Sequence, residues 1–324
     1  MDQADVKAII AELTGLCAAR YVFPDAGAQI GSLLAERLAA GRYAGAADDA
    51  ALAALVTEDL QAVSSDKHLR LLYSADELPA NDDDQGEAAA LARWAALSAG
   101  GVARAELLDG NIGYLDLRPV LFPPSMAGDA AAAAMSLVAQ ADALIIDLRQ
   151  CLGGDPGMVA LLCSYLFDDE PVHLIDLHER EGNRIRQYWT LPYVPGRRIG
   201  SARPVDLLTS TTTFSGGEEL CYDLQQLGRA TVIGERTGGG AHPREAFTVR
   251  PHLQATIPVA RGVSPVTGTN WEGTGVTPDI EVPAGDALGV AYQRALTHVL
   301  SLGDEGARTR TAGAARDALR ALSG

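Results

Sequence analysis

An alternation of short apolar runs and longer segments with helical spacing, between residues 141 and 235, most constrains the fold. The run at 144–148 is apolar at almost every position, which is typical of a strand buried on both faces. Similar runs lie at 172–177, 204–210 and 230–235. Because the strands alternate with helices, the pattern predicts a mainly parallel α/β core.

The first 65 residues repeat apolar side chains at helical spacing in three blocks. Asp48 or Asp49 can accept hydrogen bonds from the free N–H groups at the start of the third block. This part of the chain therefore predicts a small helical bundle. The segment 74–87 that follows is acidic, contains proline and has few apolar residues, so it indicates an exposed linker. The three blocks lie at 6–17, 30–38 and 52–63.

The remaining segments complete the expected organisation. We expect a hairpin around Asp109-Gly110 and, further on, a helix that leads into the strand at 144–148. The end after Gly303 is rich in alanine and arginine and indicates a helix or a loose tail. The patterns predict a helical domain at 1–75, an α/β core at 76–303 and a C-terminal helix or tail at 304–324.

Charge and composition exclude several classes of function. The net charge of −16 repels phosphate backbones and anionic lipids, so we expect a small molecule or a peptide as the partner and no nucleic acid. The first 20 residues are periodic instead of continuously apolar, which predicts no secretory signal, no membrane insertion and a cytoplasmic location. The sequence is compatible with a monomer and with a homo-oligomer.

No cofactor, metal site or disulfide framework is expected. The four cysteines lack the spacing of metal ligands, and no histidine lies in an HExxH pattern. Packed, reduced thiols are therefore predicted at Cys17, Cys151, Cys163 and Cys221.

The segment 204–227 is the most informative about chemistry. An apolar strand runs into a Ser/Thr-rich loop, and Ser215-Gly216-Gly217 opens a helix where free N–H groups and the positive helix end converge. Such donors stabilise the oxyanion that forms when a serine attacks a carbonyl. Ser215 is therefore either a nucleophile or a helix N-cap. Thr213 stands where a GxSxG elbow has its first glycine.

Other loops carry candidates with more than one interpretation. Gly153-Gly154 follows a buried strand and can cradle a phosphate, supply half of an oxyanion hole or make a tight turn. His242 lies in a Gly-rich loop and is either a base or a surface residue. Glu272 can orient a histidine or be solvated. His68, just past the third helical block, can simply face the helix end.

In series, six segments resemble the tail-specific protease family, which includes carboxyl-terminal processing proteases, the tricorn protease core and the modules of interphotoreceptor retinoid-binding protein. They occur in the family's order over most of residues 1–285. The resemblance implies an N-terminal helical bundle plus a crotonase- and ClpP-like α/β core. The segments are YVFPDAG, SSDKHLRLLYS, DALIIDLRQCLGG, PVDLLTSTTTFSGGEE, GRATVIGERTGGGAHP and WEGTGVTPDIEV.

The resemblance also implies roles for individual residues. It aligns Ser215 with the nucleophile. Members with a Ser/Lys dyad carry lysine where this chain has Gly240, so a lysine base is missing. The tricorn-like members instead take a histidine and a glutamate from positions that match His68 and Glu272. His68 is then the base, Glu272 orients the hydrogen bonds, and His242 is a rival base.

The oxyanion hole implied by the resemblance combines the N–H of Gly216 with a donor from Gly153 or Gly154. Cys151 departs from the family, because relatives usually have asparagine at that place. The sequence between residues 72 and 144 is too short, and has the wrong pattern, for the PDZ domain of processing proteases.

Two classes of function follow from these observations. A serine peptidase or related acyl hydrolase explains why a hydroxyl, an imidazole and a carboxylate all occur at the matching positions. A catalytically silent carrier of a hydrophobic ligand, such as a retinoid or fatty acid, is the alternative. A pathway-specific hydrolase of a peptide or of a non-peptide ester is a third hypothesis.

Overall fold

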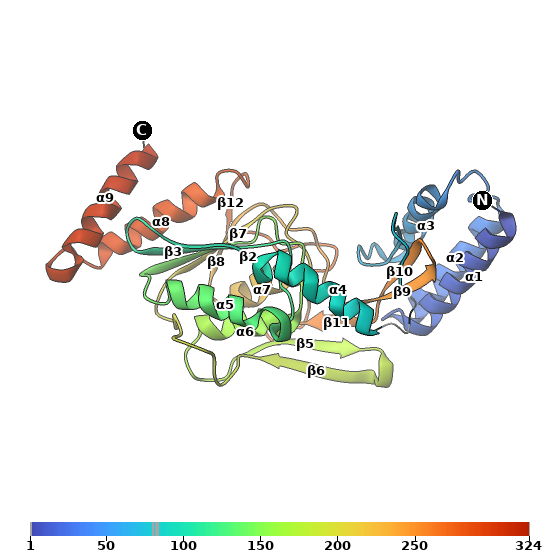
Figure 1. The fold of residues 1–324 in the computed structure, drawn as a ribbon, viewed down its shortest axis with the longest axis horizontal. Helices are drawn as coiled ribbons and strands as arrows, with labels where there is room; N and C mark the ends of the chain where they lie inside the picture. Colours follow the sequence, from blue (N-terminus) through green and yellow to red (C-terminus); the bar gives the residue numbers. More distant parts are fainter. Residues whose placement is uncertain (1, 80, 82–83, 324) are drawn as a thin grey trace. The chain divides into compact units, whose positions relative to one another are not determined.

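The computed structural model describes residues 2–79, 81 and 84–323, and Figure 1 shows its elements. The chain divides into two compact units, and two later segments of the chain belong to the N-terminal unit. Unit 1 comprises Met1–Leu91, Asp176–Arg186 and Gly240–Val263. Unit 2 comprises Ala92–Ile175, Gln187–Gly239 and Ser264–Gly324.

The predicted helical blocks form α1 (Gln3–Arg20), α2 (Pro24–Ala39) and α3 (Asp49–Ser64) in unit 1. The Asp48 carboxylate accepts the N–H of Ala51 at 2.8 Å, which caps α3 as the sequence predicts. Apolar side chains of all three helices share one core with a small sheet. That core includes Ile9, Leu13, Ile30, Leu34, Leu52, Leu60, Leu253, Ala255 and Ile257.

Two small sheets lie wholly or partly within the residues of unit 1. In the first, the strand order is β1 (Arg70–Tyr73), β10 (Leu253–Pro258), β9 (Arg244–Arg250). In the second, the order is β11 (Ala260–Val263), β5 (His173–Glu179), β6 (Arg184–Trp189), with β11 antiparallel to β5. Because β10 buries alternate side chains in the helical core, the segment 240–263 folds with the N-terminal unit.

Unit 2 is built on a six-stranded sheet that is parallel except at the β2–β3 hairpin, which confirms the predicted α/β core. Every residue of β4 and β7 is buried, as expected for strands covered on both faces. The strand order is β12 (Ile280–Glu281), β8 (Thr231–Gly234), β7 (Val205–Thr209), β4 (Ala143–Asp147), β3 (Ile112–Leu117), β2 (Val102–Leu108).

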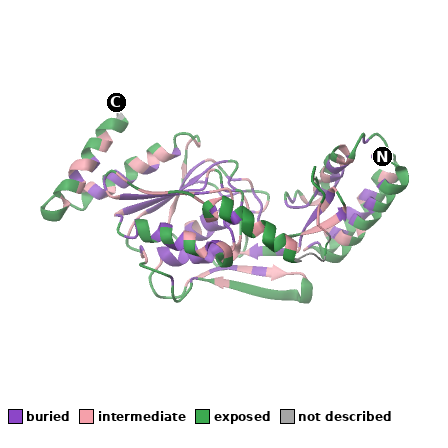
Figure 2. Cartoon of the chain, in the orientation of Figure 1, coloured by how far each residue is buried: buried purple, intermediate pink, exposed green. Residues whose placement is uncertain are grey.

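Helices cover both faces of this sheet (Figures 1 and 2). On one face α8 (Ala287–Ser301) packs against Ile145, Leu208 and Ile233. The other face carries α5 (Pro124–Val138), α6 (Pro156–Leu166) and α7 (Gly216–Gln226). The buried strands lie between these layers, and the helices turn exposed residues outward.

The segment predicted as a linker is partly helical. The helix α4 spans Asp84–Leu97, so residues 84–87 of the predicted linker are helical, while residues 80, 82 and 83 lie outside the described residues. The Ala/Arg-rich end forms α9 (Thr309–Ser323). Short 3-10 turns lie at Ala99–Gly101, Glu181–Asn183 and Gly306–Arg308.

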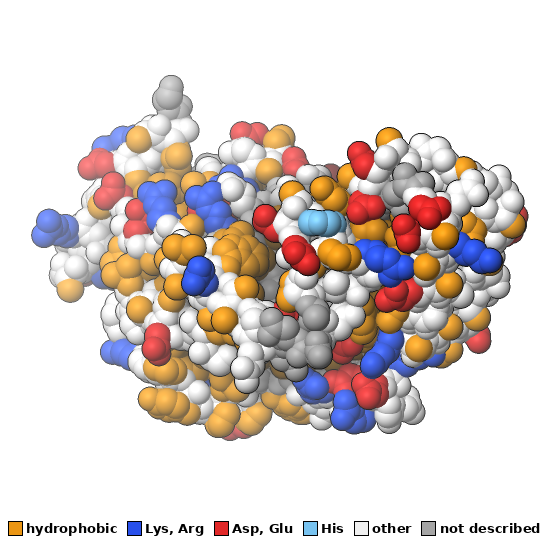
Figure 3. Space-filling model, turned by 45° about the vertical axis from the view of Figure 1, so that its right-hand side comes forward, with side chains coloured by type: hydrophobic (Ala, Val, Ile, Leu, Met, Phe, Trp, Pro, Cys, Tyr) orange, Lys and Arg blue, Asp and Glu red, His pale blue; other side chains and the backbone are white. Residues whose placement is uncertain are grey.

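Surface charge and hydropathy give two further observations. Acidic and basic side chains are interspersed over the face drawn in Figure 3. Within the described residues, no helix combines the length and the apolar character that a membrane crossing requires. All four cysteines are buried and free.

Candidate active site

Ser215 occupies a strained turn between β7 and α7 of unit 2. Its φ of 49° and ψ of −122° place a non-glycine residue in a sparsely populated region. The turn is held by the Phe214 N–H, which donates to the Cys151 carbonyl at 3.0 Å, and by the Gly217 N–H, which donates to Phe214. Ser215 is half-buried at the first turn of α7, where the helix dipole favours negative charge.

The glycine pair after β4 approaches this serine closely. A β-carbon on Gly153 would lie 2.8 Å from the Ser215 Cβ and 3.3 Å from its Oγ. A β-carbon on Gly216 would lie 2.7 Å from the Gly154 carbonyl oxygen. The φ angles of +130° at Gly153 and +143° at Gly154 also favour glycine. Gly153, Gly154 and Gly216 therefore need to be glycine, because side chains at these positions would separate the loop after β4 from the serine turn.

Backbone donors at this contact are unused. In the described part of the chain, the N–H groups of Gly153, Gly154 and Gly216 donate no hydrogen bond, whereas the neighbouring Leu152 and Asp155 N–H groups donate to Pro119 and Leu121. Gly153 and Gly216 are buried, whereas Gly154 is exposed. Buried N–H groups are almost always paired, so the unused donors of Gly153 and Gly216 beside a serine suggest a bound anion or oxyanion. The structure thus brings together Ser215, Gly216, Gly153 and Gly154.

Glu218, which the sequence analysis did not select, fixes the serine turn. Its fully buried carboxylate accepts the Ser215 N–H at 2.9 Å, the Gly239 N–H at 2.7 Å and the Thr237 hydroxyl. Thr237 in turn accepts the Val276 N–H at 2.7 Å. The S-x-x-E spacing of a capping box was the signal for this residue.

Cys151 lies under the glycine loop and acts through packing. Its thiol donates to the Gly153 carbonyl at 3.6 Å, and burial raises its pKa to about 11. A β-carbon on Gly217 would lie 2.9 Å from the Cys151 Sγ. The neutral thiol therefore supports the strained turn and is not itself a nucleophile.

Two further carboxyls of α7, Glu219 and Asp223, are buried on the helix one turn apart. Glu219 Oε1 and both Asp223 carboxyl oxygens have no hydrogen-bond partner among the described residues. Burial, with the nearby Asp155 charge, raises the pKa of Glu219 to about 8, and burial beside Glu219 raises the pKa of Asp223 well above its usual range. Glu219 therefore holds its proton in the folded state at neutral pH, and the same burial favours the neutral form of Asp223.

We expect this pair to make the folded state less stable as the pH rises. Folding raises the pKa of the carboxyl, so over a range of pH the native state still holds a proton that the unfolded chain has already lost. For Glu219 this range runs from about pH 4.5 to about 8. Within it, the unfolding free energy falls as the pH rises, by up to roughly 1.4 kcal/mol per pH unit for each proton. Urea unfolding of wild type and of Glu219→Gln/Asp223→Asn across this range measures the difference. The exposed Asp129→Asn variant on α5 is the control. Identical pH slopes in wild type and the double variant would refute the prediction.

The two candidate histidines and an unpredicted aspartate lie in unit 1. Asp66, buried after α3, accepts the Tyr21 hydroxyl at 3.2 Å and the His68 N–H at 3.0 Å, and it lies 2.8 Å from His242 Nδ1. Because a carboxylate only accepts, Nδ1 of His242 carries the hydrogen in this contact. Asp66 and His242 lie 176 positions apart in the chain, so no local sequence pattern predicts their contact.

His68 is held by its backbone and buried to 7% exposure. Its carbonyl accepts the Thr256 hydroxyl at 2.6 Å. Burial lowers the pKa of His68 to about 4, and the nearby Asp66 charge only partly offsets the effect. The imidazole is therefore neutral at physiological pH, with a ring nitrogen able to accept a proton.

Glu272 lies in unit 2, half-buried in the turn that follows the buried Trp271. Its N–H donates to the Asn270 side chain at 2.9 Å. The Gly273 N–H donates to the Gly239 carbonyl, which links this turn to the loop that contacts Glu218. The roles of Ser215, His68, Glu272 and His242 stay predictions.

Comparison with known families identifies the class of the protein. A family model described as peptidase family S41 matches residues 111–282. A second, described as the N-terminal domain of peptidase S41 in eukaryotic IRBP, matches residues 3–98. The protein is therefore a serine peptidase. The chain belongs to peptidase family S41, which confirms the predicted resemblance to the tail-specific proteases.

Solved structures share the fold at low identity. A lipoprotein from Streptococcus agalactiae is 14% identical, with 90% of this chain and 96% of that chain covered and a TM-score of 0.60. A photosystem II D1 C-terminal processing protease is 17% identical, with coverages of 85% and 92% and a TM-score of 0.50. The tricorn protease is 14% identical, with coverages of 92% and 37% and a TM-score of 0.57.

Proposed function

We propose that this serine peptidase cleaves its substrate through nucleophilic attack by Ser215. The supporting observation is the strained serine turn, which packs against the Gly153–Gly154 loop, where the N–H groups of Gly153, Gly154 and Gly216 donate no hydrogen bond to the described residues. A carrier of hydrophobic ligands would have no need for such donors beside an alcohol. Strain at a single non-glycine residue is common at functional sites and costs about 1–3 kcal/mol, so a functional reason is expected for its retention.

In the proposed mechanism, the Ser215 Oγ attacks the carbonyl carbon of the scissile bond while His68 takes the hydroxyl proton. The N–H groups of Gly216 and of Gly153 or Gly154 stabilise the oxyanion. The intermediate then expels the amine, which receives the proton from His68. Water then attacks the acyl-enzyme, with His68 again taking the proton, and the acid is released as the Ser215 hydroxyl regains a proton from His68. Glu272 orients the hydrogen bonds of the base.

His242 is the rival base, and the contact with Asp66 supports it. An aspartate at 2.8 Å from Nδ1 sets the tautomer that leaves Nε2 basic, as in Asp–His pairs of hydrolases. His68 is retained as the proposed base because of its place in the family pattern. The pH dependence of catalysis separates the two.

The proposal is tested by labelling with a small neutral fluorophosphonate. We expect the reagent to react with Ser215 in the wild-type chain and the label to disappear in Ser215→Ala. The exposed Ser136→Ala variant on α5 is the matched control and should label normally. Absence of labelling, together with saturable binding of a fatty acid, would instead support the carrier hypothesis.

We expect the acidic limb of the pH–rate profile to lie at an unusually low pH. A base with a pKa of about 4 stays unprotonated down to that pH, so kcat/KM should remain level from about pH 7 to 5 and fall only below that. The His68→Ala variant should lose at least roughly a hundredfold in kcat/KM. Circular dichroism at each pH controls for unfolding. Full activity in His68→Ala, with strong loss in His242→Ala, would transfer the role to His242.

A further inference from the structure

A groove of about 580 Å³ opens in unit 2 beside the serine turn. It lies where β3, β4 and β7 end, which is the edge at which α/β sheets usually bind ligands. Leu152 directly precedes Gly153 and Thr212 precedes Ser215 by three positions, so the same two loops form the groove and the candidate active site. The groove and the candidate active site are therefore built on neighbouring parts of the same two loops.

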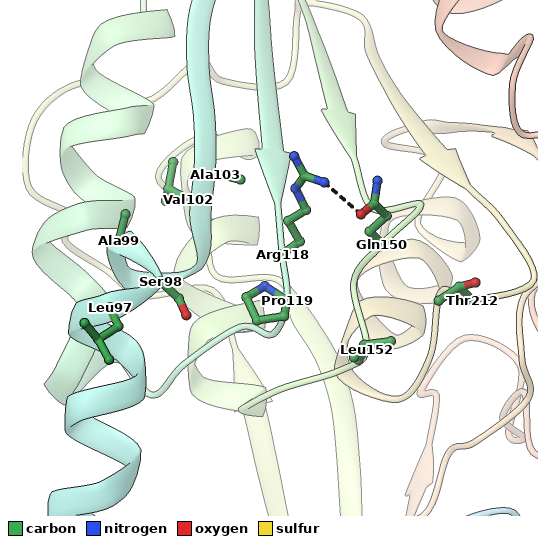
Figure 4. Close-up of a pocket in the computed structure, with 10 residues that line it drawn as sticks. All are labelled: Leu97, Ser98, Ala99, Val102, Ala103, Arg118, Pro119, Gln150, Leu152 and Thr212. Atoms are coloured by element: carbon green, nitrogen blue, oxygen red, sulfur yellow. Dashed lines mark hydrogen bonds between the residues drawn. The ribbon is translucent and has the colours of Figure 1, made fainter.

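The polar wall of the groove offers hydrogen-bond donors. The Arg118 Nη1 donates to the Gln150 Oε1 at 2.7 Å, which fixes the amide because a guanidinium cannot accept (Figure 4). The acceptor of Gln150 is thereby occupied, and its NH₂ group remains. Arg118 Nη2 makes no hydrogen bond to the described residues. The wall therefore suits a ligand that accepts hydrogen bonds.

Charge further restricts the ligand. Arg118 is the one charged residue of the groove lining, in a chain of net charge −16. The Asp116 Oδ2 lies 3.1 Å from the Arg118 Nε, and the Asp116 side chain is 14% exposed against 40% for Arg118. Part of the guanidinium charge is thus available to solvent or ligand, which favours a carboxylate over a neutral carbonyl.

The rim is apolar on both sides. Leu97, at the end of α4, is 82% exposed, and Leu152 is 52% exposed. Figure 4 shows Leu97 on one side and Leu152 on the other, with Pro119 between them. Large exposed apolar side chains beside a polar wall are typical of a ligand groove.

We propose that this groove binds the part of a peptide substrate in which an apolar side chain lies next to a carboxylate, with Arg118 as the specificity-determining residue. The inference rests on the proposed function for the position of the scissile bond at Ser215. The carboxylate can come from an acidic side chain or from a chain end, and both present the same two oxygens to the guanidinium and to the Gln150 amide.

Binding to the full-length Ser215→Ala protein tests the proposal without any need for catalysis. Three ligands are compared by NMR titration: acetyl-leucyl-glutaminyl amide, which is neutral; acetyl-leucyl-glutamyl amide, with a side-chain carboxylate; and acetyl-leucyl-glutamine, with a terminal one. We expect at least one carboxylate ligand to bind roughly three- to tenfold more tightly than the neutral peptide. The preferred ligand identifies the source of the carboxylate.

Variants in the same background locate the effect. Arg118→Met should abolish the preference, while Arg118→Lys should keep part of it. Arg104→Met, which removes the same charge from β2 where Arg104 pairs with Glu106, is the matched control and should keep the full preference. Equal affinities for all three ligands, or a preference that survives Arg118→Met, would overturn the proposal. Failure of Ser215 labelling would instead contradict the proposed function alone.

Discussion

The Ser215→Ala variant is expected to lose peptide hydrolysis by roughly four orders of magnitude in kcat. The hydroxyl is the proposed nucleophile, and the neighbouring Cys151 thiol cannot replace it, because that thiol is buried and neutral. A fluorogenic peptide library provides the measurement, since it requires no knowledge of the preferred sequence.

The same variant should keep its fold. Alanine retains the Ser215 backbone N–H that donates to Glu218, so the unfolding free energy should change by less than about 1 kcal/mol. The Ser136→Ala protein again provides the matched control. Hydrolysis by Ser215→Ala at a rate near that of wild type would remove the serine from the mechanism.

The second large effect is expected for Gly153→Ala. The new methyl group would lie 2.8 Å from the Ser215 Cβ, at a φ of +130° that alanine rarely adopts. The loops must then separate, which moves the Gly153 N–H away from the oxyanion position. We expect kcat to fall by about 10²–10³, the loss typical for one oxyanion donor, and the unfolding free energy to fall by about 1–3 kcal/mol.

Gly289→Ala on α8 is the control for Gly153→Ala. A β-carbon there meets nothing within 4 Å and the glycine lies inside a helix, so stability should rise slightly and kcat should not change. Wild-type kcat in a folded Gly153→Ala protein would show that this loop does not form the oxyanion hole.

Hydrophobic periodicity was sufficient to predict most of the fold. Strands such as β4 and β7 are apolar throughout because helices cover both faces, and this pattern is local. The strand β1 buries one residue of four and β6 is largely exposed, so neither has a periodic signal. The pairing of β1 with β10 joins residues far apart in sequence, which no local pattern can indicate.

The candidate site was predictable to a similar extent. The family resemblance implied that Gly153 or Gly154 lies beside Ser215. In the structure the loops after β4 and β7 meet because the two strands are adjacent and parallel. The Glu218 contact has a local spacing signal. The Asp66–His242 contact depends on the return of 240–263 to the helical unit, and only the structure reveals it.

A crystal structure of the protein after reaction with the small fluorophosphonate would show whether Ser215 and the glycine N–H groups form one catalytic site. We expect phosphorus bonded to the Ser215 Oγ, with the phosphonyl oxygen about 2.7–3.1 Å from the Gly216 nitrogen and from that of Gly153 or Gly154. A phosphonyl oxygen directed into solvent, with none of these three N–H groups in contact, would contradict this expectation.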